Sequence, residues 1–285
     1  MKTLTWIDTA VCLGNGQSRQ GLDLTKMKEY ATVIGCNAIY RDFTPDILVA
    51  LDSRIAHEIY RNANIKNMKA YLGYWTPIPN MVAMEMLSSC KTKIDSDATE
   101  GGNDCVYHGA DGVFTAIKGK DLGIAYVSET KQSQGPVTNI EPEVDGFKYA
   151  TGSRSIYLAC ELSAKEVFIV GHDLYSDTKK VNNIYAGSKG YAEKDALAAR
   201  PNNPDETFNW ILQHKNTFDK FPDVQFYKVN KRGDAARGKT SWAMDVNFRF
   251  PRGNAAQTNQ EIPEWSSCPN LKYITQEEME QMLYN

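Results

Sequence analysis

Three groups of small and polar residues follow apolar segments, at places where α/β proteins commonly bind ligands. The first group is the turn Gly14-Asn15-Gly16, which leads on to Ser18. Backbone N–H groups in a turn of small residues can approach a phosphate or a ribose closely, and a helix N-terminus behind the turn favours an anion. Gly, Asn and Ser are also ordinary turn residues, so a turn without a ligand is the alternative interpretation.

The second and third groups follow two further apolar segments. Asn37 comes after segment 32–36, where its amide could hydrogen-bond a ligand at the carboxyl end of a strand, although a local Asx turn explains it equally well. His172 and Asp173 follow segment 166–171 in the same way. Because ligands of α/β proteins bind at strand ends, His172 is a candidate general base. A strand-end histidine that is exposed or merely hydrogen-bonded is the alternative.

The elements that must position these groups alternate as in α/β proteins. Continuous apolar runs of this length are typical of strands that are covered on both faces. The predicted strands are 9–13, 32–36, 46–51, 68–72, 166–171 and 224–229. The predicted helices are 24–30 with Asp23 as its cap, 54–61, one from after Thr151-Gly-Ser153 to about 162, one that opens at 204–206, and one from about 275. The sequence therefore predicts an α/β fold.

The composition is that of a globular chain. The 285 residues are 42% hydrophobic and 24% charged, with a formal net charge of −3, which excludes a collagen-like, low-complexity or wholly disordered protein. No apolar run approaches about 20 residues and the N-terminus has no long apolar stretch, so we expect neither a transmembrane segment nor secretion. The six cysteines include no CxxC pair, which favours buried thiols and a cytoplasmic location.

A basic segment lies late in the chain. Residues 228–252 contain seven Lys and Arg residues against two Asp, so the remainder carries a net charge of −8. Aromatic residues such as Trp242 and Phe248 lie among these charges. This mixture suits a polyanionic partner, either a nucleic acid or a phosphorylated acceptor. A solvated basic face over a few core aromatics is the alternative.

One domain accounts for most of the length. Residues 1–230 are predicted to form a nucleotide-binding α/β domain, in which 73–148 is a loop-rich insertion. Residues 231–285 are predicted to be a basic C-terminal extension packed on the same domain. The oligomeric state stays open, a homo-oligomer included.

Three motifs occur in the order and spacing of a known family. They are Gly14-Asn15-Gly16-x-Ser18, Cys36-Asn37-x-x-Tyr40, and Thr151-Gly152 about twenty residues before Gly171-x-Asp173-Leu174-Tyr175. Over residues 9–60 and 150–230 the chain resembles the bacterial sialyltransferases that act on lipooligosaccharide, together with related uncharacterised proteins. The resemblance implies one Rossmann-like domain of the glycosyltransferase-A type, with a mainly parallel sheet and helices on both faces. It also implies a nucleotide-sugar donor, with a CMP-sugar favoured, and no required metal or other cofactor.

The resemblance further implies roles for individual residues. Tyr175 and Tyr185 would contact the donor phosphate and stabilise the leaving group. The stretch 176–203 would be a lid that closes on the donor and excludes water. The residues implied to bind the nucleotide are Gly14, Asn15, Gly16, Ser18, Asn37, Thr151, Gly152, Ser153 and Asp173.

The general base needs a separate prediction, because the family's histidine precedes the helix that here begins near 205. This chain reads Arg200-Pro-Asn-Asn-Pro-Asp205 at that place and has no histidine there. We therefore predict His172 as the base, and we expect His214 on the flank of the following helix.

Two other functions stay open. Residues 233–240 match the phosphate-binding pattern GxxxxGK[ST], although no helix is predicted after them, and Asp95-Ser-Asp97 matches the DxD pattern within a turn-rich loop. Archaeal pterin pyrophosphokinase-like proteins resemble the same Gly-Asn-Gly architecture, so an ATP-dependent pyrophosphokinase or phosphotransferase is one alternative. A non-catalytic protein that binds a nucleotide or a polyanion is the other.

Overall fold

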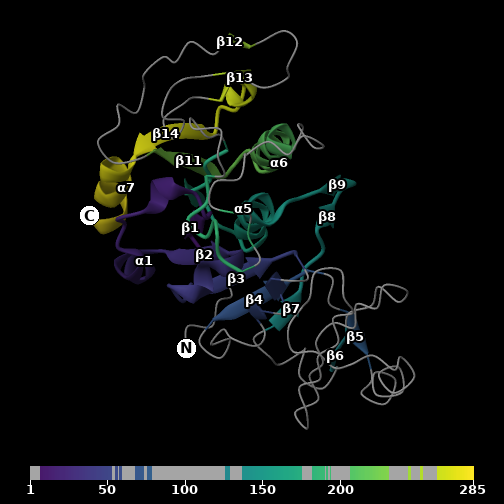
Figure 1. Ribbon diagram of the computed structural model, residues 1–285. Coiled ribbons are helices and arrows are strands. Elements are labelled where there is room, and N and C mark those ends of the chain that lie inside the picture. The colour runs from purple at the N-terminus through teal and green to yellow at the C-terminus, as the bar shows by residue number, and fades with distance from the viewer. Residues whose placement is uncertain are drawn as a thin grey trace.

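Eight parallel strands form the central sheet in the part of the chain that the computed structural model describes (Figure 1). The described residues are 7–52, 55–56, 58–59, 68–73, 76–78, 126–128, 137–174, 182–189, 191, 193, 206–230, 243–244, 251–252 and 262–285. In spatial order the strands are β14 (Leu271–Thr275), β11 (Gln225–Asn230), β10 (Glu166–Val170), β1 (Thr9–Leu13), β2 (Thr32–Cys36), β3 (Ile47–Ala50), β4 (Lys69–Leu72) and β7 (Val137–Asn139). Each neighbouring pair in this order is parallel.

Helices cover both faces of the sheet (Figure 1). The helices α5 (Thr151–Glu161) and α6 (Glu206–Lys220) pack on one face, and α1 (Leu24–Tyr30) and α7 (Gln276–Tyr284) pack on the other. Successive strand residues point to opposite faces, so Cys12 lies in the hydrophobic cluster under α5 and α6 while Val11 lies in the cluster under α1. Because both faces are buried, consecutive strand positions are apolar, and this explains the continuous runs in the sequence.

Short elements complete the described part. Three 3₁₀ helices are η1 (Gln17–Arg19), η2 (Asn37–Arg41) and η6 (Pro263–Trp265). Three two-stranded pairs are β5 (Thr76–Ile78) with β6 (Tyr126–Ser128), β8 (Glu143–Val144) with β9 (Phe147–Lys148), and β12 (Ala243–Met244) with β13 (Pro251–Arg252).

The strand order reverses between β1 and β10. The chain leaves β1 toward β2, β3, β4 and β7 on one side, and then returns to β10, β11 and β14 on the other side of β1. The connections after β1 and β10 therefore run in opposite directions from neighbouring strands. Ligands of open parallel sheets bind outside the carboxyl ends of the strands at such a reversal. The residues that follow β1 and β10 are therefore the first candidates for a ligand-binding site.

The predicted fold class is confirmed, because the sheet is parallel, Rossmann-like and covered on both faces. Strands 9–13 and 32–36 and helix 24–30 have the predicted bounds. Asp23 caps α1, since its carboxylate accepts a hydrogen bond from the backbone N–H of Lys26 at 3.0 Å.

Two strands of the sheet were not predicted. β7 lies within the segment 73–148 that we interpreted as an insertion, and β14 lies within the C-terminal extension 231–285. β7 has three residues, and β14 is a partly exposed edge strand in which Lys272 points to solvent. Neither strand contains the continuous apolar run that marks a strand buried on both faces, which is why the sequence pattern missed them.

The described residues also show whether a helix could span a membrane and where the cysteines lie. Within the described residues, no helix is long and apolar enough to cross a bilayer. The cysteines at 12, 36, 160 and 268 are buried free thiols, as predicted for these four.

Candidate functional site

The turns after β1 and β10 pack backbone against backbone at the strand reversal. The N–H of Gly14 donates to the carbonyl oxygen of Val170 at 2.8 Å, and the N–H of Gly16 donates to that of Gly171 at 2.8 Å. A Cβ atom at Gly14 would lie 2.4 Å from the Gly171 carbonyl oxygen, well inside van der Waals contact. Position 14 therefore requires glycine because two backbones meet there.

Ser18 and Asp173 join the same two turns through their side chains. The backbone N–H of Ser18 donates to Asp173 Oδ2 at 2.8 Å, and the Ser18 hydroxyl donates to the other carboxylate oxygen. A Cβ atom at Gly16 would lie 2.4 Å from the Asp173 side chain. These three predicted nucleotide contacts thus hold the turns together, and both Asp173 oxygens already accept hydrogen bonds.

Asn15 and Asn37 present unused acceptors at the carboxyl ends of β1 and β2. The Asn15 amide donates to the Cys36 carbonyl oxygen at 3.2 Å, which leaves its buried Oδ1 without a partner among the described residues. Asn37 has a φ of 52°, a left-handed conformation that asparagine tolerates better than most residues, and its Oδ1 is likewise buried and unpartnered. The two amides can therefore accept hydrogen bonds from a ligand at adjacent strand ends.

The N-terminus of α5 reaches the same edge of the sheet. Thr151, Gly152 and Ser153 form the first turn of α5, which corrects our expectation that they precede the helix. The N-cap Ala150 is extended and has no side chain to accept a hydrogen bond, so the first-turn N–H groups are available to an anion. A Cβ atom at Gly152 would lie 3.2 Å from the His172 ring, which puts the helix N-terminus directly beside that imidazole.

His172 and His214 form a buried pair behind this helix end. His172 Nδ1 and His214 Nε2 are 3.1 Å apart, and His214 Nδ1 lies 2.7 Å from the Trp210 carbonyl oxygen. A carbonyl oxygen only accepts, so we assign the proton to His214 Nδ1, which makes its Nε2 the acceptor for His172 Nδ1–H. His172 Nε2 then carries a lone pair, and it has no partner in the described structure.

The expectation for His214 was wrong. Its side chain is buried with 2% exposure and does not lie on the flank of α6. Ile211, His214 and Phe218 follow the i, i+3, i+7 spacing of one helix face, and all three are buried. That spacing is visible in the sequence, where His214 lies on the same helix face as Ile211 and Phe218.

Both imidazoles are neutral near pH 7. Burial is the main cause that lowers the pKa of His214 to about 4; the hydrogen bond to Trp210 opposes it, and the charge of Lys228 acts in the same direction as burial. Burial also holds the pKa of His172 well below its ordinary value, with His214 and Lys228 acting in the same direction. The unpartnered Nε2 of His172 is therefore available as a proton acceptor.

Residues 182–189 and 191, which we call the strap, lie over the turns after β1 and β2. The N–H of Ile184 donates to the Asn15 carbonyl oxygen at 2.9 Å, and the N–H of Ala38 donates to the Tyr191 hydroxyl at 3.3 Å. The strap belongs to the stretch 176–203 that was predicted to form a lid. Its described part is hydrogen-bonded to both turns.

Tyr185 lies in the strap beside Arg19. The Arg19 guanidinium donates to the Tyr185 hydroxyl at 2.9 Å, and that hydroxyl donates to the Asp42 carboxylate. Burial and Asp42 raise the pKa of Tyr185, so it is un-ionised. The hydroxyl that was predicted to contact the donor phosphate therefore already has two partners, whereas the buried Arg19 Nε has none among the described residues.

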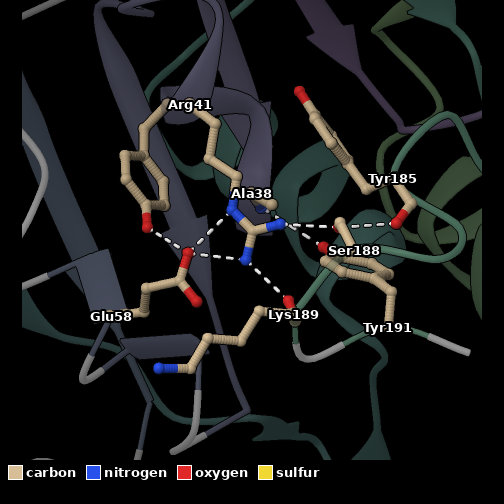
Figure 2. Close-up of polar contacts among 8 residues, drawn as sticks. Ala38, Arg41, Glu58, Tyr185, Ser188, Lys189 and Tyr191 are labelled. Carbon is tan, nitrogen blue, oxygen red and sulfur yellow. Dashed lines mark hydrogen bonds and ion pairs between the residues drawn. The ribbon is translucent and has the colours of Figure 1, made fainter. Parts of the chain in front are cut away.

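Arg41 fastens the strap to the body of the domain (Figure 2). Its Nε donates to Glu58 at 2.7 Å, its Nη1 to the Ser188 hydroxyl at 2.8 Å, and its Nη2 to the Lys189 carbonyl oxygen at 2.7 Å. One guanidinium thus connects η2, Glu58 and the strap. Because these bonds are charge-assisted, each is stronger than a neutral hydrogen bond.

Replacing Arg41 by methionine is expected to loosen the strap. The backbone amides of Ile184 and Ala38 should exchange with solvent at least about tenfold faster, since about 1.4 kcal/mol of local stability corresponds to a factor of ten. Hydrogen exchange measured by mass spectrometry or NMR checks this. Lys215→Met removes an ion pair to Asp219 on the outer part of α6 and should leave both amides unchanged. Unaltered exchange in Arg41→Met would show that the strap is held without the guanidinium.

Several predicted features lie outside the described residues. They are Tyr175, the DxD pattern at 95–97, the pattern GxxxxGK[ST] at 233–240, and most of the basic segment 228–252. Among the described residues of that segment, Lys228 is the basic one whose side-chain environment the structure shows, and it is buried in β11 with 4% exposure. The interpretation of this lysine as part of a solvated basic face is therefore wrong.

Sequence reasoning did not predict the burial of four polar residues in and around the sheet: Arg19, His214, Lys228 and Asn230. Lys228 and Asn230 lie on the same face of β11 as Phe226. The spacing of two residues between these positions was visible in the sequence and could have indicated their burial.

In the described ranges, no group of three or more His, Cys, Asp and Glu side chains is arranged to hold a metal ion. Compared with protein-family models, curated proteins and solved structures, the chain shows no significant match.

Proposed function

We propose that the protein transfers a glycosyl group from a nucleotide-sugar to an acceptor hydroxyl. The observation that carries this proposal is the buried His172, whose Nε2 is unpartnered and unprotonated at the strand reversal and lies next to the N-terminus of α5. A general base and an anion-binding helix end then meet at one place. Transfer from a nucleotide-sugar needs both, because the acceptor hydroxyl must lose a proton and the leaving phosphate must be stabilised.

The nucleotide would bind at the ends of β1 and β2. The Oδ1 atoms of Asn15 and Asn37 would accept hydrogen bonds from the base or the ribose, and this is supported by their burial without a partner in the described part. The first-turn N–H groups of α5 would hold the phosphate. The unpartnered Nε of Arg19 offers a second donor to the same group.

His172 would take the proton of the acceptor hydroxyl on Nε2. The hydroxyl oxygen forms a bond to the anomeric carbon as the bond from that carbon to the phosphate oxygen breaks, and the electron pair leaves with the nucleotide. His214 acts as a positioning residue, because its Nε2 accepts the His172 Nδ1 proton and so fixes the tautomer. Burial holds the pKa of His172 low, and the negative charge of a bound donor nearby would raise this pKa toward its ordinary value.

A CMP-sugar is the favoured donor because the three motifs resemble the lipooligosaccharide sialyltransferases. Thermal unfolding with CMP, UDP, GDP and Mg-ATP at millimolar concentration tests this. We expect CMP to raise Tm, since a ligand of the native state stabilises it by mass action. Asn37→Gly removes the amide and keeps the left-handed backbone, and it should weaken CMP binding about tenfold, in line with one or two lost hydrogen bonds.

Lys272→Met, on the outer strand β14, is the matched control and should bind CMP as the wild type does. Stabilisation by Mg-ATP alone would contradict the glycosyltransferase proposal and favour phosphoryl transfer. The absence of any nucleotide effect would contradict both.

A further inference from the structure

Lys228 is a buried cation with a single weak hydrogen bond. It is 4% exposed, and its Nζ donates to the Val229 carbonyl oxygen at 3.3 Å. An ammonium group carries three N–H donors, and no described carboxylate lies within ion-pair distance of this one. Burial lowers the pKa of Lys228, and the charge of Asp173 opposes that effect. Two of its three N–H donors therefore have no acceptor among the described residues.

Asn230 lies beside Lys228 on the same face of β11 and is also incomplete. It is fully buried, and neither its Oδ1 nor its Nδ2 has a partner within the described ranges. A buried amide without hydrogen bonds is unfavourable, so a ligand that supplies them would be held there. Its amide offers one acceptor and two donors, which suits a group that contains both an oxyanion and a hydroxyl.

The two residues lie on the side of His172 away from the proposed nucleotide. The strand order is β11-β10-β1-β2, and His172 follows β10, while Asn15 and Asn37 follow β1 and β2. With strands about 4.8 Å apart, β11 lies about 10 Å from β1 and about 15 Å from β2. The charge of Lys228 nevertheless acts on both His172 and His214. Lys228 is also the register partner of Ile169 on β10, the strand that leads to His172, so it lies near the proposed base without sharing the strand ends of the nucleotide.

We infer that Lys228 and Asn230 bind the negatively charged group of the acceptor, on the β11 side of His172. This inference rests on the proposed function for the statement that the ligand is the acceptor. The chemistry is that of a sugar with an oxyanion next to hydroxyl groups, either a carboxylate of an acidic sugar or a phosphate of a sugar phosphate. The ammonium of Lys228 pairs with the oxyanion, and the Asn230 amide bonds to the oxyanion and to a neighbouring hydroxyl. An acceptor held there would present a hydroxyl to His172 Nε2.

Thermal unfolding with three sugars tests the site. The probes are glucuronate, glucose 6-phosphate and uncharged glucose, each at matched ionic strength, with and without saturating CMP. We expect at least one of the two charged sugars to raise the Tm of the wild type, also when CMP is bound, and glucose to have no effect. The charged sugar that acts identifies carboxylate or phosphate as the recognised group.

Lys228→Met keeps the length of the side chain and removes its charge. We expect this variant to be at least as stable as the wild type without ligand, because a buried charge without a partner is replaced by an apolar group. Its affinity for the charged sugars should fall at least tenfold. A lysine with a purely structural role would give the opposite result, a lower Tm without ligand and an unchanged response to the sugars. Lys272→Met, on the exposed side of β14, should behave as the wild type.

Asn230→Asp is the second variant, and it keeps the test decisive if Lys228→Met does not fold. The new carboxylate gives Lys228 an internal partner and repels an oxyanion, so the charged sugars should lose their effect on Tm. An unchanged response to charged sugars in either variant would overturn the inference, and so would the absence of a response in the wild type. Loss of the sugar effect when CMP is added would also overturn it, because the anion would then be that of the donor.

Different experimental results would contradict the inference and the proposed function. If no nucleotide raises Tm, the proposed function is contradicted, whereas a response to charged sugars that depends on Lys228 still supports the anion site. If CMP binds and the charged sugars do not, the nucleotide site stands and the acceptor assignment falls.

Discussion

Replacing His172 by asparagine is expected to lower the rate of glycosyl transfer by about 10²- to 10⁴-fold, the range typical for loss of a general base. The asparagine Nδ2 can take the place of the imidazole Nδ1–H and keep the hydrogen bond to His214, so the fold at the strand reversal should persist. What disappears is the unpartnered Nε2. Single-turnover transfer or donor hydrolysis, with the nucleotide-sugar whose nucleotide raises Tm, measures this effect.

The affinity for the nucleotide distinguishes loss of the general base from damage to the nucleotide-binding site. In His172→Asn we expect the Kd for CMP to stay within about twofold of the wild type, because the nucleotide is proposed to contact Asn15, Asn37 and the first turn of α5. Transfer within about threefold of the wild-type rate would exclude His172 as the base. Lys165→Met, an exposed lysine at the opposite end of β10, is the matched control and should leave both quantities unchanged.

The stability of the protein is expected to fall as the pH drops from 7 toward 4, and His214 contributes to this loss. The pKa of a histidine in the unfolded chain is 6.5, and burial lowers the pKa of His214 to about 4 in the native state. Between these values the unfolded state binds a proton that the native state does not, so the free energy of unfolding decreases with falling pH. At about 1.4 kcal/mol per pKa unit, the loss from His214 amounts to about 2 to 3 kcal/mol by pH 4.5.

Urea unfolding of the wild type and of His214→Gln between pH 7.5 and 4.5 checks this contribution. A glutamine oxygen can accept the His172 Nδ1 proton in place of the His214 Nε2 lone pair, so the variant keeps that contact and loses the titration. The stability difference between the two proteins should shift by about 2 to 3 kcal/mol in favour of the variant over this pH range. His172 titrates in the same direction and stays in both proteins. Parallel stability curves would show that His214 does not change its protonation on unfolding.

The neutral imidazole of His172 is hydrogen-bonded to a second neutral imidazole, that of His214. Neither histidine has a carboxylate partner among the described residues, in contrast to catalytic histidines that are oriented by an acid. The charge that forms on His172 during transfer would therefore be balanced by the ligand and not by the protein. This dependence on an anionic ligand agrees with the effect of burial, which lowers the pKa of both histidines and of Lys228.

Much of the fold could be predicted because local patterns coincide with tertiary burial. The runs 9–13 and 32–36 are apolar at each buried position, and such runs have few alternatives to a strand covered on both faces. β14 could not be found in this way, because Lys272 is exposed and the strand lies at the edge of the sheet. An edge strand is stabilised by its neighbour more than by its own side chains, and the neighbour is not visible in the local sequence.

The strand-end positions of Asn15, Asn37 and His172 can be predicted from the local sequence, since each comes within two residues of the end of an apolar run. Which of these residues meet depends on tertiary contacts, because the strand order that joins β1 to β10 pairs segments more than 150 residues apart. The same holds for His214, which becomes a partner of His172 only when α6 packs on the sheet. Hydrogen bonds and pKa values at the site depend on that packing, because burial removes the water that would otherwise satisfy each polar group.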